Sequence, residues 1–350
     1  MGLLQYNLCG SDIQVLNKLK IMIQSSNNVK LAYDRIKDTL HCTPLINSEV
    51  LNDMLGANIY FKMESFQKTG AFKVRGVLNR LLILKENGEL PKQIVGYSTG
   101  NHGIGLAWAA QQLDIKARIY LPKDTSPVKQ RAATYYGAEV IYTDTRAEAE
   151  EKTKYDGNNG LYYMHPSDSD DTIAGAGTAC YEALIQMDGV APDAIFASCG
   201  GGGLLSGTYL AKDLLSPDSK LIATEPLNAN DAYLSIKQNN IFRFKDSPNT
   251  IADGLRTLGV SERTFSYLKK LDGFYLVEEN KILYWTAWLI HLLKIACEPS
   301  CALNMAGLCE WLSTQNGRKN ALVIISGGNI DPVIYRQLWQ EDYLKEVPKV

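Results

Sequence analysis

The stretch NIYFKMESFQKTGAFKVRG at residues 58–76 decides the fold. Residues 58–64 alternate and are rich in β-forming side chains, which predicts a strand. Residues 71–84 place apolar side chains at helical spacing, which predicts a helix after a turn at Thr69 and Gly70. Lys73 then lies in the first helical turn, where the helix dipole and partial burial both favour the neutral, nucleophilic amine. Because a lone lysine is more often a solvated surface residue, other stretches must decide between these interpretations.

Composition excludes several classes of protein. The 350 residues are 45% hydrophobic with a net charge of −2 and no basic tract, which argues against nucleic-acid binding as the main role. The apolar run at 282–295 is short and carries His291 and Lys294, so it predicts a buried helix and no membrane span. The N-terminus lacks a signal-peptide pattern, and seven cysteines without a CxxC motif suit reduced thiols. We therefore expect a cytoplasmic protein.

The rest of the chain alternates short strands with helices. We expect strands at 94–97, 117–121, 139–142, 194–197, 221–224, 274–277 and 321–325. We expect helices at 12–24, 29–40, 101–113, 126–136, 146–155, 178–187, 207–215, 279–296 and 301–312. Residues 228–258 look irregular. This alternation predicts two α/β units with parallel sheets and right-handed crossovers in one continuous chain.

Three loops at predicted strand ends could carry chemistry, because ligands of open α/β sheets bind there. The loop STGNHG (98–103) offers hydroxyls, an amide and free N–H groups for a carboxylate, although an ordinary helix cap is the alternative. The loop SCGGGGL (198–204) exposes consecutive N–H groups that can wrap a phosphate, with a flexible turn as the alternative. The loop SGGN (326–329) places a small polar residue where it can address a ring nitrogen, or it is a structural turn.

Two glycine patterns do not fit nucleotide-binding motifs. The four glycines are not followed by Gly-Lys-Ser/Thr, and they do not satisfy GxGxxG. Gly175 and Gly177 form a weaker near-match that does not follow a clear strand.

A reactive lysine, a phosphate cup, a carboxylate cradle and a ring-nitrogen partner together predict pyridoxal phosphate bound to an amino acid.

These motifs resemble those of the fold-type II pyridoxal-phosphate enzymes, in the branch of serine racemase and the serine/threonine dehydratases. The likeness spans roughly residues 30–332 with similar order and spacing, and HP (165–166), IAG (173–175), TIADG (250–254) and CEPS (297–300) agree with it. It implies a tryptophan-synthase-β-like α/β fold. It also implies a large cofactor-binding domain at 1–80 and 167–350, and a small mobile domain at 81–166 that closes over the substrate.

The resemblance also implies roles for single residues. Lys73 would carry the cofactor as a Schiff base and move the α-proton, while Phe72 packs by the ring and Asn101 binds the ring hydroxyl. The remaining cofactor-binding residues would be Gly200, Gly201, Gly202, Gly203, Leu204, Gly254, Glu298 and Ser326. The substrate carboxylate would be held by Ser98, Thr99, Asn101 and His102.

Ser326 and Thr99 bear on the reaction. A serine at the ring nitrogen gives a weaker electron sink than the usual charged partner, which favours prompt loss of a β-leaving group. The expected reaction is the dehydration and deamination of L-serine and L-threonine to a 2-oxo acid and ammonia. Racemases of this branch carry a serine at the position of Thr99 as a second acid/base, so Thr99 leaves serine racemisation open, and a helix cap is its other interpretation. An ammonia-lyase for 3-hydroxyaspartate and a non-catalytic cofactor-binding module are the rival functions.

The resemblance implies a divalent-cation site and marks some departures. Glu225 and Asp231 would supply carboxylates and Ala229 a backbone carbonyl, which suits Mg²⁺, Ca²⁺ or Mn²⁺, with a solvated acidic loop as the alternative. Ile104 stands where racemases usually have a nucleotide-contacting glutamine, which puts ATP activation in doubt. Ser167 replaces an asparagine near the substrate, which blurs substrate choice. The family is commonly dimeric, so a homodimer is expected, with an amino acid as the small-molecule partner.

Overall fold

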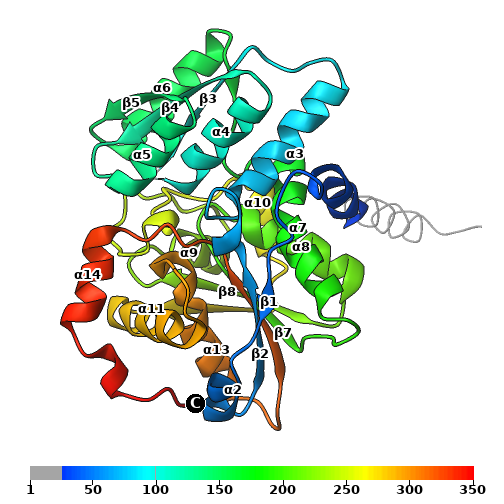
Figure 1. The fold of residues 1–350 in the computed structure, drawn as a ribbon, viewed down its shortest axis with the longest axis vertical. Helices are drawn as coiled ribbons and strands as arrows, with labels where there is room; N and C mark the ends of the chain where they lie inside the picture. The colour runs from blue at the N-terminus through cyan, green and yellow to red at the C-terminus, as the bar shows by residue number, and fades with distance from the viewer. Residues whose placement is uncertain (1–25, 99) are drawn as a thin grey trace, which may run out of the picture.

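The computed structural model describes residues 26–98 and 100–350, and it contains two β-sheets (Figure 1). The larger sheet has the strand order β1-β2-β10-β7-β8-β9, in which only the β1–β2 pair is antiparallel. Its strands are β1 (Leu45–Ile46), β2 (Asn58–Met63), β10 (Asn320–Ile325), β7 (Ala194–Ser198), β8 (Lys220–Pro226) and β9 (Gly273–Val277). The predicted strand at 58–64 is thereby confirmed.

The smaller sheet has the order β5-β4-β3-β6 and is entirely parallel. Its strands are β5 (Glu139–Thr143), β4 (Lys116–Pro122), β3 (Gln93–Tyr97) and β6 (Tyr162–Tyr163). All four lie within residues 81–166, and they form the upper part of the molecule in Figure 1. Two parallel-dominated sheets confirm the predicted fold class. The closure of this part over a substrate stays a prediction.

Helices cover the sheets and follow the strands. They are α2 (Glu49–Leu55), α3 (Lys73–Glu86), α4 (Asn101–Gln112), α5 (Pro127–Tyr135), α6 (Arg146–Asn158), α7 (Asp170–Gln186), α8 (Gly203–Leu215), α9 (Asp231–Gln238), α10 (Glu262–Leu268), α11 (Glu279–Leu293), α12 (Pro299–Ala302), α13 (Asn304–Leu312) and α14 (Pro332–Gln340). Residues 26–36 are also helical, and 3₁₀ turns lie at Glu64–Phe66, Asp253–Leu255 and Tyr343–Lys345. The helix expected at 12–24 lies outside the described residues.

Both faces of the larger sheet are buried, as parallel sheets require. Along β10, Ala321, Val323 and Ile325 belong to a core cluster with residues of α11 and α13. Leu322 and Ile324 belong to a second cluster with residues of α7 and α8. This alternation explains why the strand reads as a continuous apolar run in the sequence.

Gly175 and Gly177 lie inside α7, where they permit close packing on α3 and α8. A Cβ atom at Gly177 would clash with the carbonyl oxygen of Gly207 in α8, so no larger residue fits between the two backbones. The expected helix at 178–187 is in fact α7, which begins at Asp170 with the side chain of Ser169 accepting from the Thr172 N–H. The glycine near-match is therefore a helix-packing feature.

A buried ion cluster fixes α3, the helix that begins at Lys73. Arg75 donates from Nε to Glu64 Oε2 at 2.7 Å and from a terminal nitrogen to Glu182 Oε1 at 3.0 Å. Lys62 Nζ lies 2.5 Å from the same Glu182 oxygen. These side chains are at most 4% exposed and join β2, α3 and α7, so they hold the start of α3 against the larger sheet.

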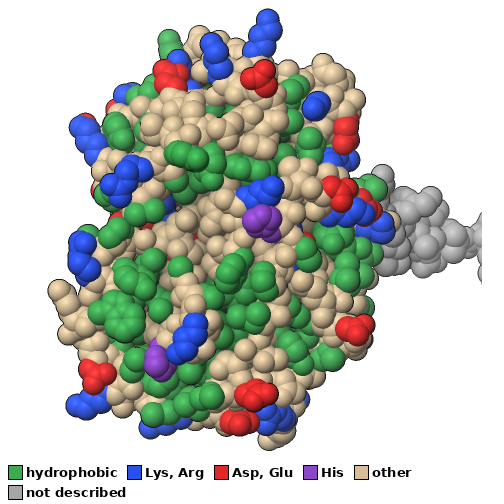
Figure 2. Space-filling view, in the orientation of Figure 1, with side chains coloured by type: hydrophobic (Ala, Val, Ile, Leu, Met, Phe, Trp, Pro, Cys, Tyr) green, Lys and Arg blue, Asp and Glu red, His purple; other side chains and the backbone are tan. Residues whose placement is uncertain are grey.

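The surface agrees with the near-neutral charge of the chain. On the face shown in Figure 2, basic and acidic side chains are interspersed and form no continuous basic patch among the described residues. Across residues 26–98 and 100–350, no helix is long and apolar enough to cross a membrane.

Candidate active site

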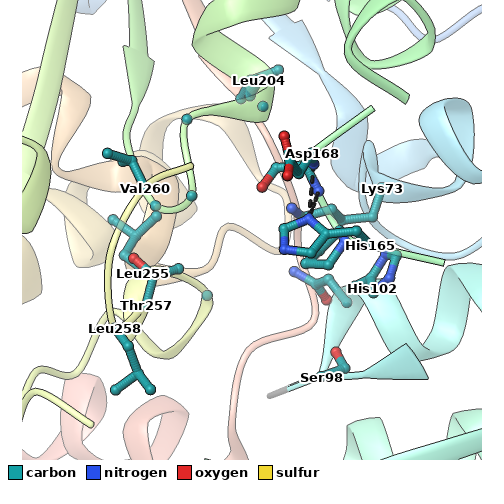
Figure 3. A pocket seen from close by; sticks show the side chains of 18 of the residues that line it. Lys73, Ser98, His102, His165, Asp168, Leu204, Leu255, Thr257, Leu258 and Val260 are labelled. Carbon is teal, nitrogen blue, oxygen red and sulfur yellow. Dashed lines mark hydrogen bonds between the residues drawn. The ribbon is translucent and has the colours of Figure 1, made fainter. Parts of the chain in front are cut away.

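One cavity of about 330 Å³ brings most of the predicted site residues together. It is bordered by loops that follow strands of both sheets, and Figure 3 shows part of its lining. The predicted residues that line it are Phe72, Lys73, Ser98, Asn101, His102, Gly200, Gly201, Gly202, Gly203, Leu204, Gly254, Glu298 and Ser326. Thr99, the predicted second acid/base, lies outside the described residues. Glu225, Ala229 and Asp231 do not line this cavity.

Lys73 is the first residue of α3, and its side chain lines the cavity (Figure 3). Burial and then the charge of Arg146 lower the pKa of Lys73 from 10.5 to about 8. Its Nζ lies 5.0 Å from the centroid of the Phe72 ring. The Phe72 N–H donates to the Ser326 carbonyl at 3.0 Å, which fixes the start of α3 beside the end of β10. An amine with this pKa is partly neutral near pH 8 and can act as nucleophile or base.

The glycine loop runs from the end of β7 to the start of α8. Gly202 has a φ of 80°, a left-handed backbone conformation that favours glycine. Because glycine has no side chain, no side-chain group caps the start of α8. A Cβ atom at Gly203 would lie 2.9 Å from the Cβ of Ser167, so a side chain would fill the cradle. The first N–H groups of this thirteen-residue helix have no partner within the helix and suit a phosphate. This loop, the Lys73 amine and Ser326 therefore fit pyridoxal phosphate.

Asn101 lies in a chain of hydrogen bonds that orients its amide. Its Nδ2 donates to Glu298 Oε1 at 2.6 Å, and its Oδ1 accepts from Asn329 Nδ2 at 2.9 Å. The second hydrogen on Asn101 Nδ2 remains for a bound group, because each amide nitrogen carries two.

Lys129 extends this chain and was missed by sequence reasoning. Its Nζ donates to Asp253 Oδ2 at 2.7 Å and to Glu298 Oε2 at 3.2 Å, and its side chain is 1% exposed. Asp253 and Glu298 lie 124 and 169 residues further along the chain, so no local signal could indicate these pairs. Lys129 thus connects α5, beside the smaller sheet, to the cavity.

The loop before α4 is organised by Ser98. Its Oγ accepts from the N–H groups of Gly100 at 2.8 Å and Gly103 at 2.9 Å. Burial lowers the pKa of His102 to about 3, so the ring is neutral. His102 Nε2 lies 3.1 Å from the Met164 carbonyl, which must accept the ring hydrogen and leave Nδ1 without one. The groups here that can donate to a carboxylate are therefore backbone N–H groups, the Asn101 amide and the Ser98 hydroxyl.

His165 shapes the neighbouring loop. Its Nδ1 accepts from the N–H groups of Ser167 at 3.1 Å and Asp168 at 2.8 Å, as the dashed lines in Figure 3 mark. Burial lowers the pKa of His165 to about 4, which keeps Nδ1 as an acceptor. Ser167 in turn packs against Gly201 and Gly203. The HP motif thus positions the glycine loop.

Arg146 is a second residue that sequence reasoning missed. It is the first residue of α6, is 8% exposed and lines the cavity. Its Cζ lies 5.4 Å from the centroid of the Tyr97 ring, which lines the same cavity. In the sequence it appears only as a residue near the start of a helix, and nothing local distinguishes it from a surface arginine.

The predicted cation site is buried beside β8. Glu225 accepts from the N–H groups of Ala232 at 3.1 Å and Tyr233 at 3.0 Å, and Asp231 Oδ1 accepts from Thr257 Oγ1 at 3.3 Å. Asp231 Oδ2 is buried with no hydrogen-bond partner among the described residues. Burial raises the pKa of both carboxyls, and the charge of Asp231 adds to the rise at Glu225.

The donor set at this site is small but chemically suitable. Two fully buried carboxyls and an unused oxygen suit a hard divalent cation, with carbonyl and water ligands completing the coordination. In the described ranges, no group of three or more His, Cys, Asp or Glu residues is placed to hold a metal ion. Any bound cation would therefore need the Ala229 carbonyl and several waters.

Comparison with known proteins identifies relatives over most of the chain. Residues 36–327 match the family model described as pyridoxal-phosphate dependent enzyme. The chain is 38% identical to a serine racemase of Dictyostelium discoideum, over 87% of this chain and 94% of that protein. It is 35% identical to the L-threo-3-hydroxyaspartate ammonia-lyase of Saccharomyces cerevisiae, over 91% and 97%.

A solved structure is similar over most of the chain. A threonine deaminase from T.th. is 39% identical and superimposes with a TM-score of 0.80, covering 87% of this chain and 98% of that one. Residues 36–327, the part that matches the family model, contain every strand of the two described sheets. The chain therefore belongs to the fold-type II pyridoxal-phosphate-dependent enzymes, in the branch of serine racemases, threonine deaminases and hydroxyaspartate ammonia-lyases.

Proposed function

We propose that the protein converts L-serine and L-threonine to a 2-oxo acid and ammonia by α,β-elimination, with racemisation of serine as a second outcome at the same site. The observation that carries this proposal is the Lys73 amine, whose pKa is lowered to about 8 in a cavity that also contains the glycine loop and Ser326. A non-catalytic binding module would not need a lysine in this state.

The lysine supplies the base in this proposal. Bound pyridoxal phosphate supplies an electron sink for the charge that develops at the substrate α-carbon. Lys73 in its neutral form accepts the α-proton, and its pKa lies near the working pH, where general-base catalysis is most efficient. The N–H groups of Gly200 to Gly203 would hold the phosphate, and the uncharged Ser326 would face the ring nitrogen.

The substrate would be oriented by the loop before α4. Its carboxylate would receive hydrogen bonds from N–H groups at the start of α4 and from Asn101, whose amide is held by Glu298 and Asn329. The β-hydroxyl then leaves as water. The enamine that is released hydrolyses to the 2-oxo acid and ammonia.

One incubation tests this function. Purified protein with pyridoxal phosphate, Mg²⁺ and L-serine should form pyruvate, and chiral separation should quantify any D-serine. Pyruvate without D-serine would remove the racemase outcome and with it the acid/base role proposed for Thr99. Formation of neither product from L-serine or L-threonine would overturn the proposal.

Two further assignments belong to the same proposal. A divalent cation would bind at Glu225, Ala229 and Asp231, away from the cavity, and would have a structural role. The protein would form a homodimer, which analytical ultracentrifugation of the holoenzyme would test. A second candidate substrate is 3-hydroxyaspartate, because a relative that is 35% identical over 91% of this chain is named an L-threo-3-hydroxyaspartate ammonia-lyase.

A further inference from the structure

Two buried cysteines lie against each other behind the wall of the cavity. The sulfur atoms of Cys297 and Cys301 are 3.6 Å apart, which is van der Waals contact, and both side chains are fully buried. Within the described ranges, no other two cysteine side chains are hydrogen-bonded to each other. Two thiols in contact can join as a disulfide without a large movement of the backbone, because bridging depends on their proximity.

This pair of thiols adjoins residues that border the cavity. Cys301 Sγ lies 3.1 Å from the Glu298 carbonyl oxygen and 3.3 Å from the Gly327 carbonyl oxygen, and it donates its hydrogen to these acceptors. The Glu298 N–H donates to the same Gly327 carbonyl at 3.1 Å. Gly327 follows Ser326, and both Glu298 and Ser326 line the cavity. The Cys301 thiol therefore helps to join the two loops that would surround the cofactor ring.

The same loop also contacts the start of α3. Gly327 forms an isolated antiparallel bridge with Ala71, and the Phe72 N–H donates to the Ser326 carbonyl at 3.0 Å. Lys73 is the next residue and the first of α3. A displacement of Gly327 is therefore transmitted to both the ring-nitrogen partner and the reactive lysine.

The two thiols are stable as thiols in the absence of an oxidant. The hydrogen bond with Cys301 and burial raise the pKa of Cys297 well above its usual value. Because the thiolate is the form that reacts with oxidants, the pair reacts slowly and stays reduced where oxidant is scarce. A small oxidant such as hydrogen peroxide reaches buried sulfurs during local openings of the fold, whereas glutathione disulfide is too large.

We propose that Cys297 and Cys301 are a modification site, at which hydrogen peroxide converts the two thiols into an intramolecular disulfide that weakens cofactor binding. One thiolate attacks a peroxide oxygen, so an S–O bond forms, the O–O bond breaks, and hydroxide leaves and takes up the thiol proton to become water. The second thiol attacks the oxidised sulfur, so the S–S bond forms, the S–O bond breaks and a second water leaves. The two thiols lose two electrons, and one peroxide is reduced to two waters.

The disulfide acts on the cavity through the hydrogen that Cys301 loses. The carbonyls of Glu298 and Gly327 no longer receive this donor, and the sulfur is drawn away from them. Glu298 also accepts from Asn101 Nδ2 at 2.6 Å, so a shift of Glu298 misaligns Asn101, while a shift of Gly327 moves Ser326. The inference deepens the proposed function, because it describes control of the same site, and it rests on that function for the identity of the cofactor.

Peroxide treatment of the holoenzyme tests the site without relying on turnover. Thiol titration after denaturation should show the loss of two thiols. Tandem mass spectrometry should place the bond between Cys297 and Cys301, which share the tryptic peptide 295–318 with Cys309. Equilibrium dialysis should show a Kd for pyridoxal phosphate at least about fivefold higher, because buried carbonyls have lost a donor. Dithiothreitol should restore the original Kd. Absence of the bond between Cys297 and Cys301 after this treatment would overturn the proposal.

Serine substitutions identify the sulfurs that are responsible. Cys301→Ser keeps a hydroxyl donor for the two carbonyls and cannot form the bond, so its cofactor affinity should not respond to peroxide. Cys297→Ser should be equally insensitive, so the conclusion does not depend on the folding of one variant. Cys309→Ser, at a partly exposed cysteine of α13, is the matched control and should respond as the unmodified protein does. An equal loss of affinity in peroxide-treated Cys301→Ser would overturn the proposal, because oxidation elsewhere would then be the cause.

Turnover of L-serine separates this inference from the proposed reaction. A holoenzyme that eliminates water from L-serine but forms no disulfide would overturn only the modification site. A disulfide-dependent loss of cofactor in a protein that turns over neither L-serine nor L-threonine would overturn only the elimination reaction. A disulfide between Cys297 and Cys301 that leaves the Kd for pyridoxal phosphate unchanged would overturn the control of cofactor binding.

Discussion

Two lysines at the cavity, Lys73 and Lys129, have opposite electrostatic surroundings. Lys73 forms no ion pair with any described residue, and burial together with Arg146 lowers its pKa to about 8. Burial also opposes the charge of Lys129, yet Asp253 and Glu298 raise the pKa of that amine above its ordinary value. Burial alone therefore does not produce a reactive lysine. No described carboxylate raises the pKa of Lys73, whereas two carboxylates raise that of Lys129, and this difference distinguishes Lys73.

The two lysines also differ in what they connect. Lys73 follows the turn after β2 and presents its amine to the cavity. Lys129 lies in α5 and reaches across to Asp253 and Glu298, which belong to segments outside the smaller sheet. We infer that one lysine performs chemistry and that the other holds together the two sides of the cavity.

Removal of Lys73 should have the largest effect. Lys73→Ala should lower turnover of L-serine by at least about a thousandfold, because both the covalent anchor and the base are lost. The absorbance band of lysine-bound cofactor should disappear as well. Lys68→Ala, at an exposed lysine five residues earlier, is the matched control and should keep both properties. Survival of turnover and absorbance in Lys73→Ala would refute the assignment.

Removal of Lys129 should mainly affect stability and cofactor affinity. Lys129→Met leaves Asp253 and Glu298 without their shared cation, and breaking a buried pair costs about 3–5 kcal/mol. Glu298 would then orient Asn101 less well, so cofactor affinity should fall too. Denaturant unfolding and cofactor titration measure these effects.

Two further variants sharpen this result. Lys129→Arg should restore part of the stability, because it keeps the positive charge. Lys123→Met breaks an ion pair whose side chains are 68% and 74% exposed, and it should leave the unfolding midpoint nearly unchanged. Equal effects of Lys129→Met and Lys123→Met would show that burial does not strengthen the Lys129 pairs.

The sequence predicted the fold class and the cavity loops because their signals are local. Loops 98–103, 198–204 and 326–329 each follow an apolar run, and the structure places all three at strand ends beside one cavity. Arg146 and Lys129 were missed because their importance comes from residues distant in the chain. The sequence also missed α9, which lies in a stretch whose Asn, Asp and Pro residues suggested irregular structure.

A third buried charged region contrasts with both lysines. Glu225 and Asp231 are fully buried carboxyls with no ion pair to any residue that the structure describes. If a cation binds there, Mg²⁺ at about a hundredfold excess over its Kd should stabilise the protein by about 2.7 kcal/mol. Asp231→Asn should abolish this response, and Asp218→Asn, at an exposed carboxylate, should preserve it. An unchanged Tm on addition of Mg²⁺, Ca²⁺ or Mn²⁺, and on treatment with a chelator, would exclude the site.

The pH dependence of cofactor capture provides the finest test of the comparison. Only the neutral amine of Lys73 attacks the cofactor aldehyde, so the capture rate by apoprotein should follow the neutral fraction. With a pKa of about 8, this fraction rises about tenfold between pH 7 and pH 9 and then levels off. A lysine with the ordinary value of 10.5 would rise about a hundredfold over that range without levelling. Arg146→Met should move the midpoint to higher pH, because the charge of Arg146 helps to lower the pKa of Lys73. Stopped-flow absorbance measures the capture rate. A midpoint near 10.5 in the unmodified protein would show that Lys73 has the pKa of an ordinary exposed lysine and would refute the assignment.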